Sequence, residues 1–437
     1  MAHYAMICPD EAGHLLPVGA VGRELVRRGH RVTVLGRAKS APIVRQLDLP
    51  LHEFDVRGIR YPLAPLSWVA FGLVGASWLV VIRNLLRFYA EEILRLVPRA
   101  LEELKVDGVL VDQTVPAGGT AAEHMGRPYV TVCSALMWNE EPDVPPSFTA
   151  WACAEGRRAR WRNRLGYAAF DWYVGPVRRK INRWRAAWNM PPIRRIGEFD
   201  SPLAQISQLC EGLDFPRRRL PDTVHYVGSL AAQRKTDDDH QFPWERLDGR
   251  PLIFASLGTV PFPANVPVYR KIAEACAGLD AQLVLALGRW NEAGDRLRNR
   301  LGHLPGNHLV VDFAPQLALL DKASLLVTHG GVNTVLEAIC RGVPMVVLPR
   351  NGDHLGMASR IEHSGAGLRA SFRRCTPEEL RRLIQRVLSE DGFRQRAREL
   401  QKTMVAAGGA SRAADIAEEA LATRRPVRRT SRSEGES

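Results

Sequence analysis

The stretch Ser324–Pro349, SLLVTHGGVNTVLEAICRGVPMVVLP, decides the fold of this chain. Its opening run SLLVTH is short and largely apolar, which predicts a buried strand. The pair Gly330-Gly331 then lets the backbone turn sharply, and a helix follows that ends at Arg341-Gly342. The run GVPMVVLP predicts the next strand. A strand, a helix and a strand in this order predict a parallel β-α-β unit.

The start of that helix has the composition of an anion-binding site. His329 ends the strand, Gly331 offers a backbone N–H, and Asn333 or Thr334 is the predicted helix cap. Thr334 and Glu337 have the spacing of a capping box, while Glu337 is also placed to accept from ribose hydroxyls. The segment therefore predicts a phosphate cradle, and ordinary α/β loop chemistry is the alternative interpretation.

The same alternation of strands and helices occurs twice along the chain. It runs through the first half, begins again at Pro251, and predicts two doubly wound α/β domains of the Rossmann type. We expect an N-terminal domain over residues 1–230, a polar linker over 231–250, a C-terminal domain over 251–422 and a disordered basic tail over 423–437. Strands are expected in the runs HYAMIC, HRVTVLG, VDGVLVDQ, PYVTVCS, PLIFASLGT, AQLVLALG and HLVVDF, and further helices near 17–28, 85–104 and 268–279.

Length and composition limit the class of protein. The chain has 437 residues, of which 46% are hydrophobic and 24% charged, values that exclude a mainly disordered chain and a polytopic membrane protein. Its seven cysteines are scattered without a CxxC pair, which argues against a disulfide framework or a cysteine-based zinc site and fits a reducing compartment. No basic segment precedes the first apolar run, so no signal peptide is expected and the cytoplasm is the predicted location.

The net charge of +13 raises the question of an anionic partner. The run Trp151–Trp188 mixes arginine with tryptophan and tyrosine, and the uncharged run Leu66–Ile82 is about the shortest length that spans a bilayer. We interpret the first as solvated basic helices and the second as a buried helix. Peripheral contact with the inner face of a membrane is the alternative for both runs. Nucleic acid is not the expected partner, because no nucleic-acid-binding motif accompanies the basic run.

A histidine and an aspartate follow separate strands of the first domain. His14 lies in a turn after the first strand, and Asp112 ends the strand VDGVLVD. Because parallel strands end at one edge of a sheet, both side chains should face the cleft, whereas Asp107 precedes its strand and should lie at the opposite edge. An imidazole oriented by a carboxylate can take a proton near neutral pH. A histidine that only caps a helix is the other interpretation of His14.

Residues Phe313 to His354 carry a longer pattern that resembles the donor signature of UDP-glycosyltransferases. The resemblance extends to Gly13-His14 and is strongest to bacterial members of the zeaxanthin-glucosyltransferase and macrolide-glycosyltransferase types. It implies the GT-B fold, in which two Rossmann-like domains face each other across a cleft. The matching residues are Phe313-Ala-Pro-Gln316, Thr328-His329-Gly-Gly331, Asn333-Thr334, Glu337, Gly342-Val-Pro344, Pro349 and Asp353-His354.

The resemblance implies a role for each of these positions. Phe313 would stack on the uracil, Gln316 would lie beside the nucleoside, and Glu337 would hold the ribose. Asp353 would bind sugar hydroxyls. The neighbouring His354 departs from the family, which commonly has glutamine there; in plant members a histidine accompanies galactose, so the identity of the hexose stays open. The diphosphate would be contacted by His329, Asn333, Thr334, the backbone of Gly331 and the turn Ser256-Leu257-Gly258-Thr259.

The implied activity is that of an inverting transferase. His14 would deprotonate an acceptor hydroxyl, which would displace UDP from a UDP-sugar and leave a β-glycoside. The resemblance implies no metal and no cofactor beyond the UDP-sugar itself; the run Asp237-Asp238-Asp239 lies in the predicted linker. The apolar and aromatic runs of the first half favour a lipophilic acceptor such as a carotenoid, terpenoid, polyketide or phenol. A UDP-sugar epimerase or hydrolase of similar fold and a UDP-sugar-binding protein without catalysis are the two alternatives.

Overall fold

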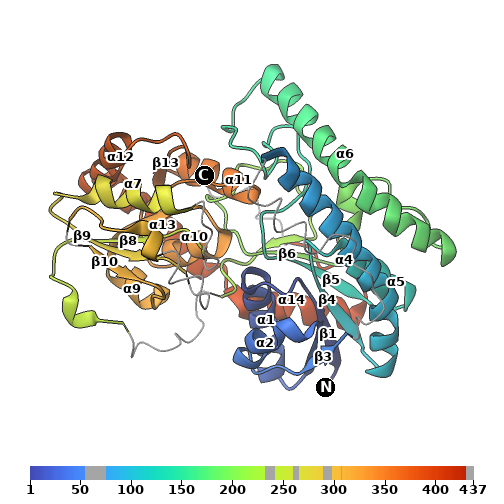
Figure 1. Ribbon diagram of the computed structural model, residues 1–437. Helices are drawn as coiled ribbons and strands as arrows, with labels where there is room; N and C mark the ends of the chain where they lie inside the picture. Colours follow the sequence, from blue (N-terminus) through green and yellow to red (C-terminus); the bar gives the residue numbers. More distant parts are fainter. Residues whose placement is uncertain (55–74, 232–241, 259–264, 289–297, 307, 430–437) are drawn as a thin grey trace, which may run out of the picture.

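The computed structural model describes residues 1–54, 75–231, 242–258, 265–288, 298–306 and 308–429, and in 75–86 it describes the backbone alone. Within this part of the chain, two parallel sheets flanked by helices form two domains (Figure 1). The N-terminal sheet has seven strands in the order β3-β2-β1-β4-β5-β6-β7, and the C-terminal sheet has six in the order β10-β9-β8-β11-β12-β13. Both orders reverse beside their first strand, so both domains are doubly wound and Rossmann-like.

The N-terminal domain carries helices on both faces of its sheet. Every residue of β1 and β4 is buried, which is why these strands read as continuous apolar runs. α1 packs on one face, and α4, α5 and α6 pack on the other (Figure 1). The strands are β1 (His3–Ile7), β2 (Arg31–Gly36), β3 (Leu51–Glu53), β4 (Gly108–Asp112), β5 (Tyr129–Cys133), β6 (Gln205–Ser207) and β7 (Val224–Tyr226); the helices are α1 (Ala12–Arg27), α2 (Ala41–Gln46), α4 (Gly75–Glu103), α5 (Pro116–His124) and α6 (Arg157–Ala187), with 3₁₀ turns at Ala38–Ser40 and Ile196–Phe199.

The C-terminal domain repeats this plan. α9, α10, α11 and α13 pack on one face of its sheet, and α7 and α12 pack on the other. The strands are β8 (Leu252–Ser256), β9 (Gln282–Ala286), β10 (Leu309–Val311), β11 (Ala323–Thr328), β12 (Met345–Val347) and β13 (Gly367–Arg369); the helices are α7 (Val266–Cys276), α9 (Gln316–Lys322), α10 (Val332–Ile339), α11 (Asp353–Ser364), α12 (Pro377–Ser389) and α13 (Asp391–Ala406), with a 3₁₀ turn at Trp244–Arg246.

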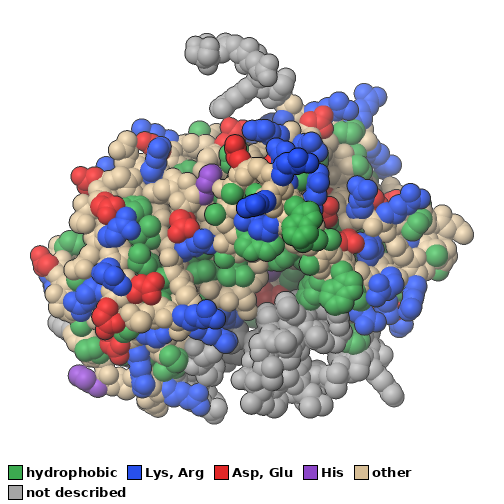
Figure 2. Space-filling view, turned by 90° about the horizontal axis from the view of Figure 1, so that it is seen from above, with side chains coloured by type: hydrophobic (Ala, Val, Ile, Leu, Met, Phe, Trp, Pro, Cys, Tyr) green, Lys and Arg blue, Asp and Glu red, His purple; other side chains and the backbone are tan. Residues whose placement is uncertain are grey.

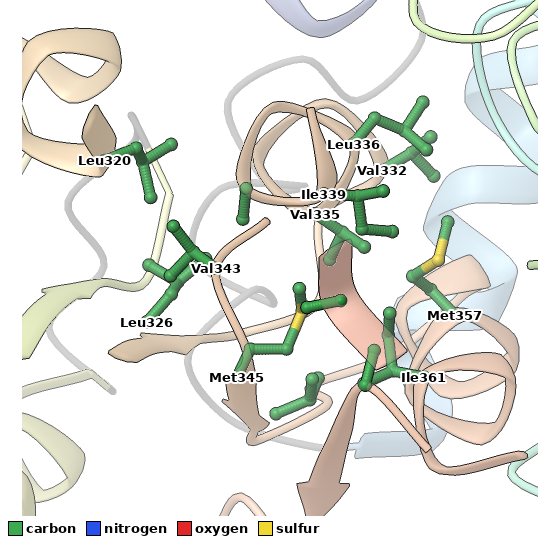
Figure 3. Packing of buried hydrophobic residues seen from close by; sticks show 14 of the residues in the cluster. Leu320, Leu326, Val332, Val335, Leu336, Ile339, Val343, Met345, Met357 and Ile361 are labelled. Carbon is green, nitrogen blue, oxygen red and sulfur yellow. The ribbon is translucent and has the colours of Figure 1, made fainter. Parts of the chain in front are cut away.

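The short helix α10 is fixed by its apolar face. Figure 3 shows Val335 and Ile339 of this helix directed toward Met345 of β12 and Ile361 of α11. These side chains are fully buried, and each such burial contributes about 1.5–3 kcal/mol to folding. The helix therefore has one position on the sheet, and its N-terminus is held at the carboxyl end of β11.

The last helix, α14 (Gly409–Thr423), corrects the expected domain boundary. Its apolar residues Ile416 and Leu421 lie in the core of the N-terminal domain, beside α1 and β5. The expected C-terminal domain over 251–422 is therefore too long at its end. Helix α14 belongs to the N-terminal domain, because its apolar face packs there. The start of the expected disordered tail is also ordered: Val427 is buried, and its backbone N–H bonds to the carbonyl of Leu203. Residues 430–437 lie outside the described residues.

Several other elements differ in their limits from those expected. α1 begins at Ala12 rather than near Pro17, and α4 begins at Gly75 rather than near Leu85. Four strands were not expected from the sequence: β3, β6, β7 and β13. Each has only three residues, too few to show a period. Within the expected linker, Phe242 packs into the C-terminal core, while residues 232–241 are not described.

A buried ion-pair cluster joins the two domains. Arg360 of α11 is almost fully buried, and its Nε donates to Asp214 Oδ1 of the N-terminal domain at 2.7 Å. The other carboxylate oxygen, Oδ2, accepts from Arg217 Nε and from the hydroxyl of Tyr226, both at 2.7 Å. The Arg360 guanidinium also lies over the ring of Phe215, at 4.5 Å from its centroid. The charge of Asp214 thus holds one arginine from each domain.

The apolar run Leu66–Ile82 lies largely outside the described residues. Its last part forms the start of the α4 backbone, and nothing is described of the side chains there. In the part of the chain that was described, no helix has both the length and the apolar character needed to span a bilayer.

Candidate active site in the interdomain cleft

A cavity of about 500 Å³ opens between the two domains. Its size falls in the range of small-molecule binding sites. One wall is the start of α1 with the end of β5, and the other is formed by the carboxyl ends of β8, β9 and β11 with the start of α10 and α11. The cavity brings together nearly all of the residues expected at the site: His14, Ser256, Gly258, Phe313, Gln316, His329, Gly331, Asn333, Thr334, Glu337, Asp353 and His354.

Asp112 lies directly behind the cavity wall, at the end of β4, and is completely buried. Its Oδ2 is 3.2 Å from His14 Nδ1, so the expected pair is formed. Asp107 lies at the opposite edge of the sheet, as expected, where its carboxylate accepts from the backbone N–H of His3. The positions of both aspartates were therefore predicted correctly from the rule that parallel strands end at the same edge of a sheet.

His14 belongs to the first turn of α1 and not to a loop. The helix continues through Pro17, which has no N–H to bond to the carbonyl of Gly13. That carbonyl instead accepts from Asn333 Nδ2 of the C-terminal domain at 2.8 Å. The backbone beside the imidazole is thereby tied to the opposite wall of the cleft.

Asn333 is bonded to the N-terminal domain at both ends of its amide. Its Oδ1 accepts from Gln208 Nε2 at 3.0 Å, and the same Nε2 atom donates to the carbonyl of Ser134 at 2.6 Å. The resemblance implied that Asn333 contacts the diphosphate. In the structure this side chain bridges the domains, so contact with a diphosphate would require it to exchange these bonds.

The carboxylate of Asp112 accepts four hydrogen bonds. Its Oδ1 accepts from the backbone N–H of Thr114 at 2.8 Å and from the Thr114 hydroxyl at 2.5 Å. Its Oδ2 accepts from the Ser134 hydroxyl at 2.5 Å and faces His14. Since Ser134 donates to Asp112, its oxygen can accept from His14 Nδ1, 2.7 Å away. The proton of His14 therefore belongs on Nδ1, and Nε2 is left as the basic atom.

The pKa of His14 reflects two opposed effects. Burial disfavours the imidazolium and lowers the pKa, whereas the charge and hydrogen bond of Asp112 raise it; the second effect prevails, and the pKa lies above the ordinary value. For Asp112, burial acts to raise the pKa, but His14, Ser134 and Thr114 together hold it below its usual range. The pair therefore consists of a stable carboxylate and an imidazole of increased basicity.

Ser134 is a residue that the sequence reasoning did not single out. It directly follows β5, and a polar residue at the end of a parallel strand was the same signal that identified Asp112. Thr114 and Gln208 were missed as well. Thr114 and Gln208 act through other side chains, so no local motif marks them.

For the UDP-dependent transfer that the sequence resemblance implies, we expect Ser134→Ala to lower kcat by about tenfold, because the hydroxyl that links His14 to Asp112 would be lost. The Kd for UDP should stay unchanged, since Ser134 is on the opposite wall from the phosphate cradle. Steady-state kinetics and calorimetric titration would measure the two quantities. Equal losses in kcat and UDP affinity would show that the serine only supports the local fold.

His329 lies between two glycines. A Cβ atom at Gly258 would lie 3.1 Å from His329 Nε2, and one at Gly331 would lie 2.8 Å from it, so larger residues would displace the ring. The ring of His354 meets it edge-on, with 4.6 Å between the centroids. Burial, together with the nearby charges of His354 and Arg350, holds the pKa of His329 well below its ordinary value. The imidazole is thus neutral at pH 7 and can offer an N–H to an anion.

The start of α10 differs from the predicted capping box. The N-cap is Gly331, and among the described residues it makes no side-chain cap bond; Thr334 is already inside the helix. Glu337 is fully buried and accepts from Gln316 Nε2 at 2.5 Å. The capping interpretation of Glu337 is therefore wrong, and its carboxylate belongs to the cavity wall. The first backbone N–H groups of α10 are left for a ligand.

The remaining predicted residues lie around the cavity. Phe313 is 41% exposed at its rim, Ser256 ends β8, and Asp353 is the first residue of α11. His354 follows with a buried Nδ1 atom that has no hydrogen-bond partner among the described residues. Thr259 lies outside the described residues, so its expected phosphate contact stays a prediction.

The described part of the chain contains no group of three or more histidine, cysteine, aspartate or glutamate side chains arranged to hold a metal ion. The anion cradle is built instead from a helix N-terminus, glycine backbone and neutral histidine. Such a donor set suits a phosphate, which the helix dipole favours.

The fold matches solved structures of GT-B glycosyltransferases. The crystal structure of the glycotransferase of kitacinnamycin superposes with a TM-score of 0.72 at 26% identity and covers 96% of this chain and 98% of its own. Sequence comparison extends the likeness beyond the fold.

The chain belongs to the family described as "UDP-glucoronosyl and UDP-glucosyl transferase", whose family model matches residues 94–403. The zeaxanthin glucosyltransferase of Pantoea ananas is 36% identical over 98% of both chains. That of Pseudescherichia vulneris is 33% identical over 97% of this chain and 98% of its own. The protein is thus a family 1 glycosyltransferase with relatives that act in natural-product and carotenoid glycosylation.

Proposed function

We propose that the protein is an inverting hexosyltransferase that moves a sugar from a UDP-sugar to a hydroxyl group of a lipophilic small molecule. One observation carries this proposal: an imidazole oriented by a buried carboxylate and a phosphate cradle face each other across one cavity. A base alone or a cradle alone would suit many proteins. Their shared cavity suits the transfer of a group from a nucleotide to an acceptor.

The donor side supports a nucleoside diphosphate. The first N–H groups of α10 and the neutral His329 would hold the phosphates, and the buried Glu337 would accept from the ribose. Phe313, exposed at the rim, would stack on the base. The phosphates would be held by N–H groups and the helix dipole, which supports a transfer that needs no metal or further cofactor.

The chemistry of the proposed step is a single displacement. His14 Nε2 takes the proton of the acceptor hydroxyl, and the hydroxyl oxygen attacks the anomeric carbon of the sugar. At the same time the bond between the anomeric carbon and the diphosphate oxygen of UDP breaks. Asp112 stabilises the resulting imidazolium, and the start of α10 stabilises the charge that develops on the leaving diphosphate. One displacement inverts the anomeric centre, so an α-linked donor gives a β-glycoside.

An aromatic cluster of the N-terminal domain supports an apolar acceptor. It combines Trp138 and Phe148, from the segment after β5, with Phe170 and Tyr173 of α6. The Phe170 ring packs edge-on to Trp138, lies 4.6 Å from the Phe148 ring centroid and stacks near Tyr173. All four rings are partly exposed. The two zeaxanthin glucosyltransferases that share a third of their residues with this chain suggest a carotenoid, with terpenoid, polyketide or phenolic hydroxyls as related candidates.

We place this activity in the cytoplasm, in line with the scattered cysteines. A lipophilic acceptor resides in membrane, so the proposal includes peripheral contact with the inner membrane face. The run Leu66–Ile82 is not used to support this membrane contact, because its side chains are not described.

The test is acceptor-dependent release of UDP. A panel of UDP-sugars that includes UDP-glucose and UDP-galactose would be incubated with hydrophobic alcohols and phenols, and parallel samples would omit the acceptor. Release that requires an acceptor would support a transferase. Release without acceptor would indicate a hydrolase, a changed sugar without release an epimerase, and UDP binding without turnover a binding protein.

We expect His354→Gln to change the preference between UDP-glucose and UDP-galactose by about tenfold, because one hydrogen bond to a sugar hydroxyl would be exchanged. The ratio of kcat/KM for the two donors would measure it. The Kd for UDP without a sugar should not change. An unaltered ratio would mean that His354 does not contact the sugar.

A further inference from the structure

The outer face of α6 carries an apolar ridge. Trp161, Leu165 and Trp172 are 66%, 49% and 74% exposed, respectively. With Ala168, which is also exposed, they follow one another at helical spacings of four, three and four residues and so share one side of the helix. Exposed tryptophans in line are unusual on a surface that faces only water. The helix buries its opposite side against the N-terminal core, so its outer side is not needed for folding.

Arginines surround this ridge on the same helix. Arg157, Arg158 and Arg164 lie near its start, and Arg179 and Arg183 lie beyond Trp172; all five are exposed. None of the five makes an ion pair with another described residue, whereas Arg160 pairs with Asp143 and Arg178 with Asp171. Figure 2, which looks onto the face that carries α6, shows large apolar side chains set among lysine and arginine side chains.

We infer that the outer face of α6 docks on an anionic lipid bilayer. Tryptophan and leucine would enter the interface between headgroups and acyl chains, while the five arginines would meet lipid phosphates. An amphipathic helix with an apolar ridge and a basic border is the surface that lies in this interface. A nucleic-acid partner would use the arginines but would not require leucine in line with the two tryptophans.

The same helix also carries aromatic residues on its inner side. Its inner face supplies Phe170 and Tyr173 to the aromatic cluster. The segment before it reaches the donor domain, where Ser359 Oγ of α11 donates to the carbonyl of Trp151 at 2.9 Å. A bilayer on the outer face would thus lie one helix diameter, about 10 Å, from the aromatic cluster. The purpose of the docking, delivery of a lipophilic acceptor, rests on the proposed function.

Vesicle binding of the full chain without substrates tests the inference. Sedimentation with phosphatidylcholine vesicles would be compared with vesicles that contain about 30% phosphatidylglycerol. We expect at least about tenfold stronger partition into the anionic vesicles, and a decrease when NaCl is raised from about 50 to 500 mM. Equal partition into both kinds of vesicle, or none, would overturn the inference.

Two variants and their controls locate the surface. Replacing Trp161, Leu165 and Trp172 together by alanine should weaken partition into the vesicles by about tenfold or more. The control is a double variant, Val26→Ala with Val405→Ala, at exposed aliphatic positions elsewhere, and its partition should not change. Replacing Arg157, Arg158 and Arg164 by glutamine should weaken it by about a hundredfold. The matched loss of three charges on the other domain, at Arg373, Arg374 and Arg382, should have little effect.

Further readouts separate the inference from its rivals and from the proposed function. Circular dichroism would verify that each variant is folded. Tighter binding of a labelled oligonucleotide than of anionic vesicles would overturn the lipid assignment. Transfer to a water-soluble phenol should be unchanged in the ridge variant. Vesicle binding without any acceptor-dependent UDP release would count against the proposed sugar transfer, and release without vesicle binding would count against membrane contact while leaving the transfer intact.

Discussion

Replacing His14 by alanine is expected to lower kcat by about a hundred- to ten-thousand-fold, the usual contribution of a positioned general base. His14 is the described imidazole of the N-terminal wall that reaches the cavity, and Asp112 and Ser134 hold its Nδ1 so that Nε2 is free to take a proton. The Kd for UDP should stay within about twofold, because the phosphate cradle belongs to the other domain. Single-turnover kinetics and calorimetric titration with UDP would measure the two effects.

The pH profile gives an independent readout of the same residue. Transfer needs neutral His14, so kcat/KM should rise with pH as this group loses its proton. Because its pKa is raised, the acidic limb should have its midpoint above the ordinary value of about 6.5. In Asp112→Asn the charge that raises the pKa is gone, so the limb should move to lower pH while the plateau falls. Retained activity in His14→Ala, or a limb that does not move in Asp112→Asn, would contradict the assigned base.

Asp214→Ala is expected to destabilise the protein by about 3–5 kcal/mol, the usual cost of removing one partner from a buried ion pair. The carboxylate holds Arg360 and Arg217, both buried, and nothing else described at this point carries a negative charge toward them. Urea unfolding followed by circular dichroism would measure the loss. Asp143→Ala, which breaks an exposed pair with Arg160, is the matched control and should leave the midpoint unchanged within error.

The difference in stability between native protein and Asp214→Ala should also depend on pH. The neighbouring arginines hold the pKa of Asp214 well below its usual range, although burial alone would raise it. A carboxyl with a lowered pKa in the folded state stabilises the fold above its unfolded pKa of about 3.9 and loses this effect as pH falls. The difference in the free energy of unfolding should therefore have its full size above pH about 5 and decrease below pH about 4. Asp214→Asn provides a second variant of nearly equal volume if the alanine variant does not fold.

The sequence predicted the elements whose signal is local. Buried parallel strands such as β4 and β11 are continuous apolar runs, and a polar residue at or directly after the end of each strand marks the cleft edge, so Asp112 and His329 were placed correctly. The start of α1 was placed too late, because Gly13 and Pro17 disfavour a helix by propensity. Packing of the following apolar residues overrides that preference, and the unused carbonyl finds Asn333 instead.

Other features depend on contacts between distant residues, which periodicity does not show. Helix α14 has the same apolar pattern as a helix of the C-terminal domain, and only the fit of Ile416 and Leu421 assigns it to the other sheet. Ser134 contacts His14 across 120 positions of sequence. The N-cap of α10 could not be predicted from a local pattern either. Glu337 has the spacing of a capping box, but its carboxylate accepts a hydrogen bond from Gln316 instead.

The return of α14 to the N-terminal domain has a consequence for recombining family members. Exchanging the donor half of one relative for that of another is a natural way to change the sugar that is transferred. A junction in the segment between the two sheets would carry α14 along and place a foreign helix in the acceptor half. The acceptor half would keep its own core only if a second junction, near Gly408, returned the native C-terminus to it.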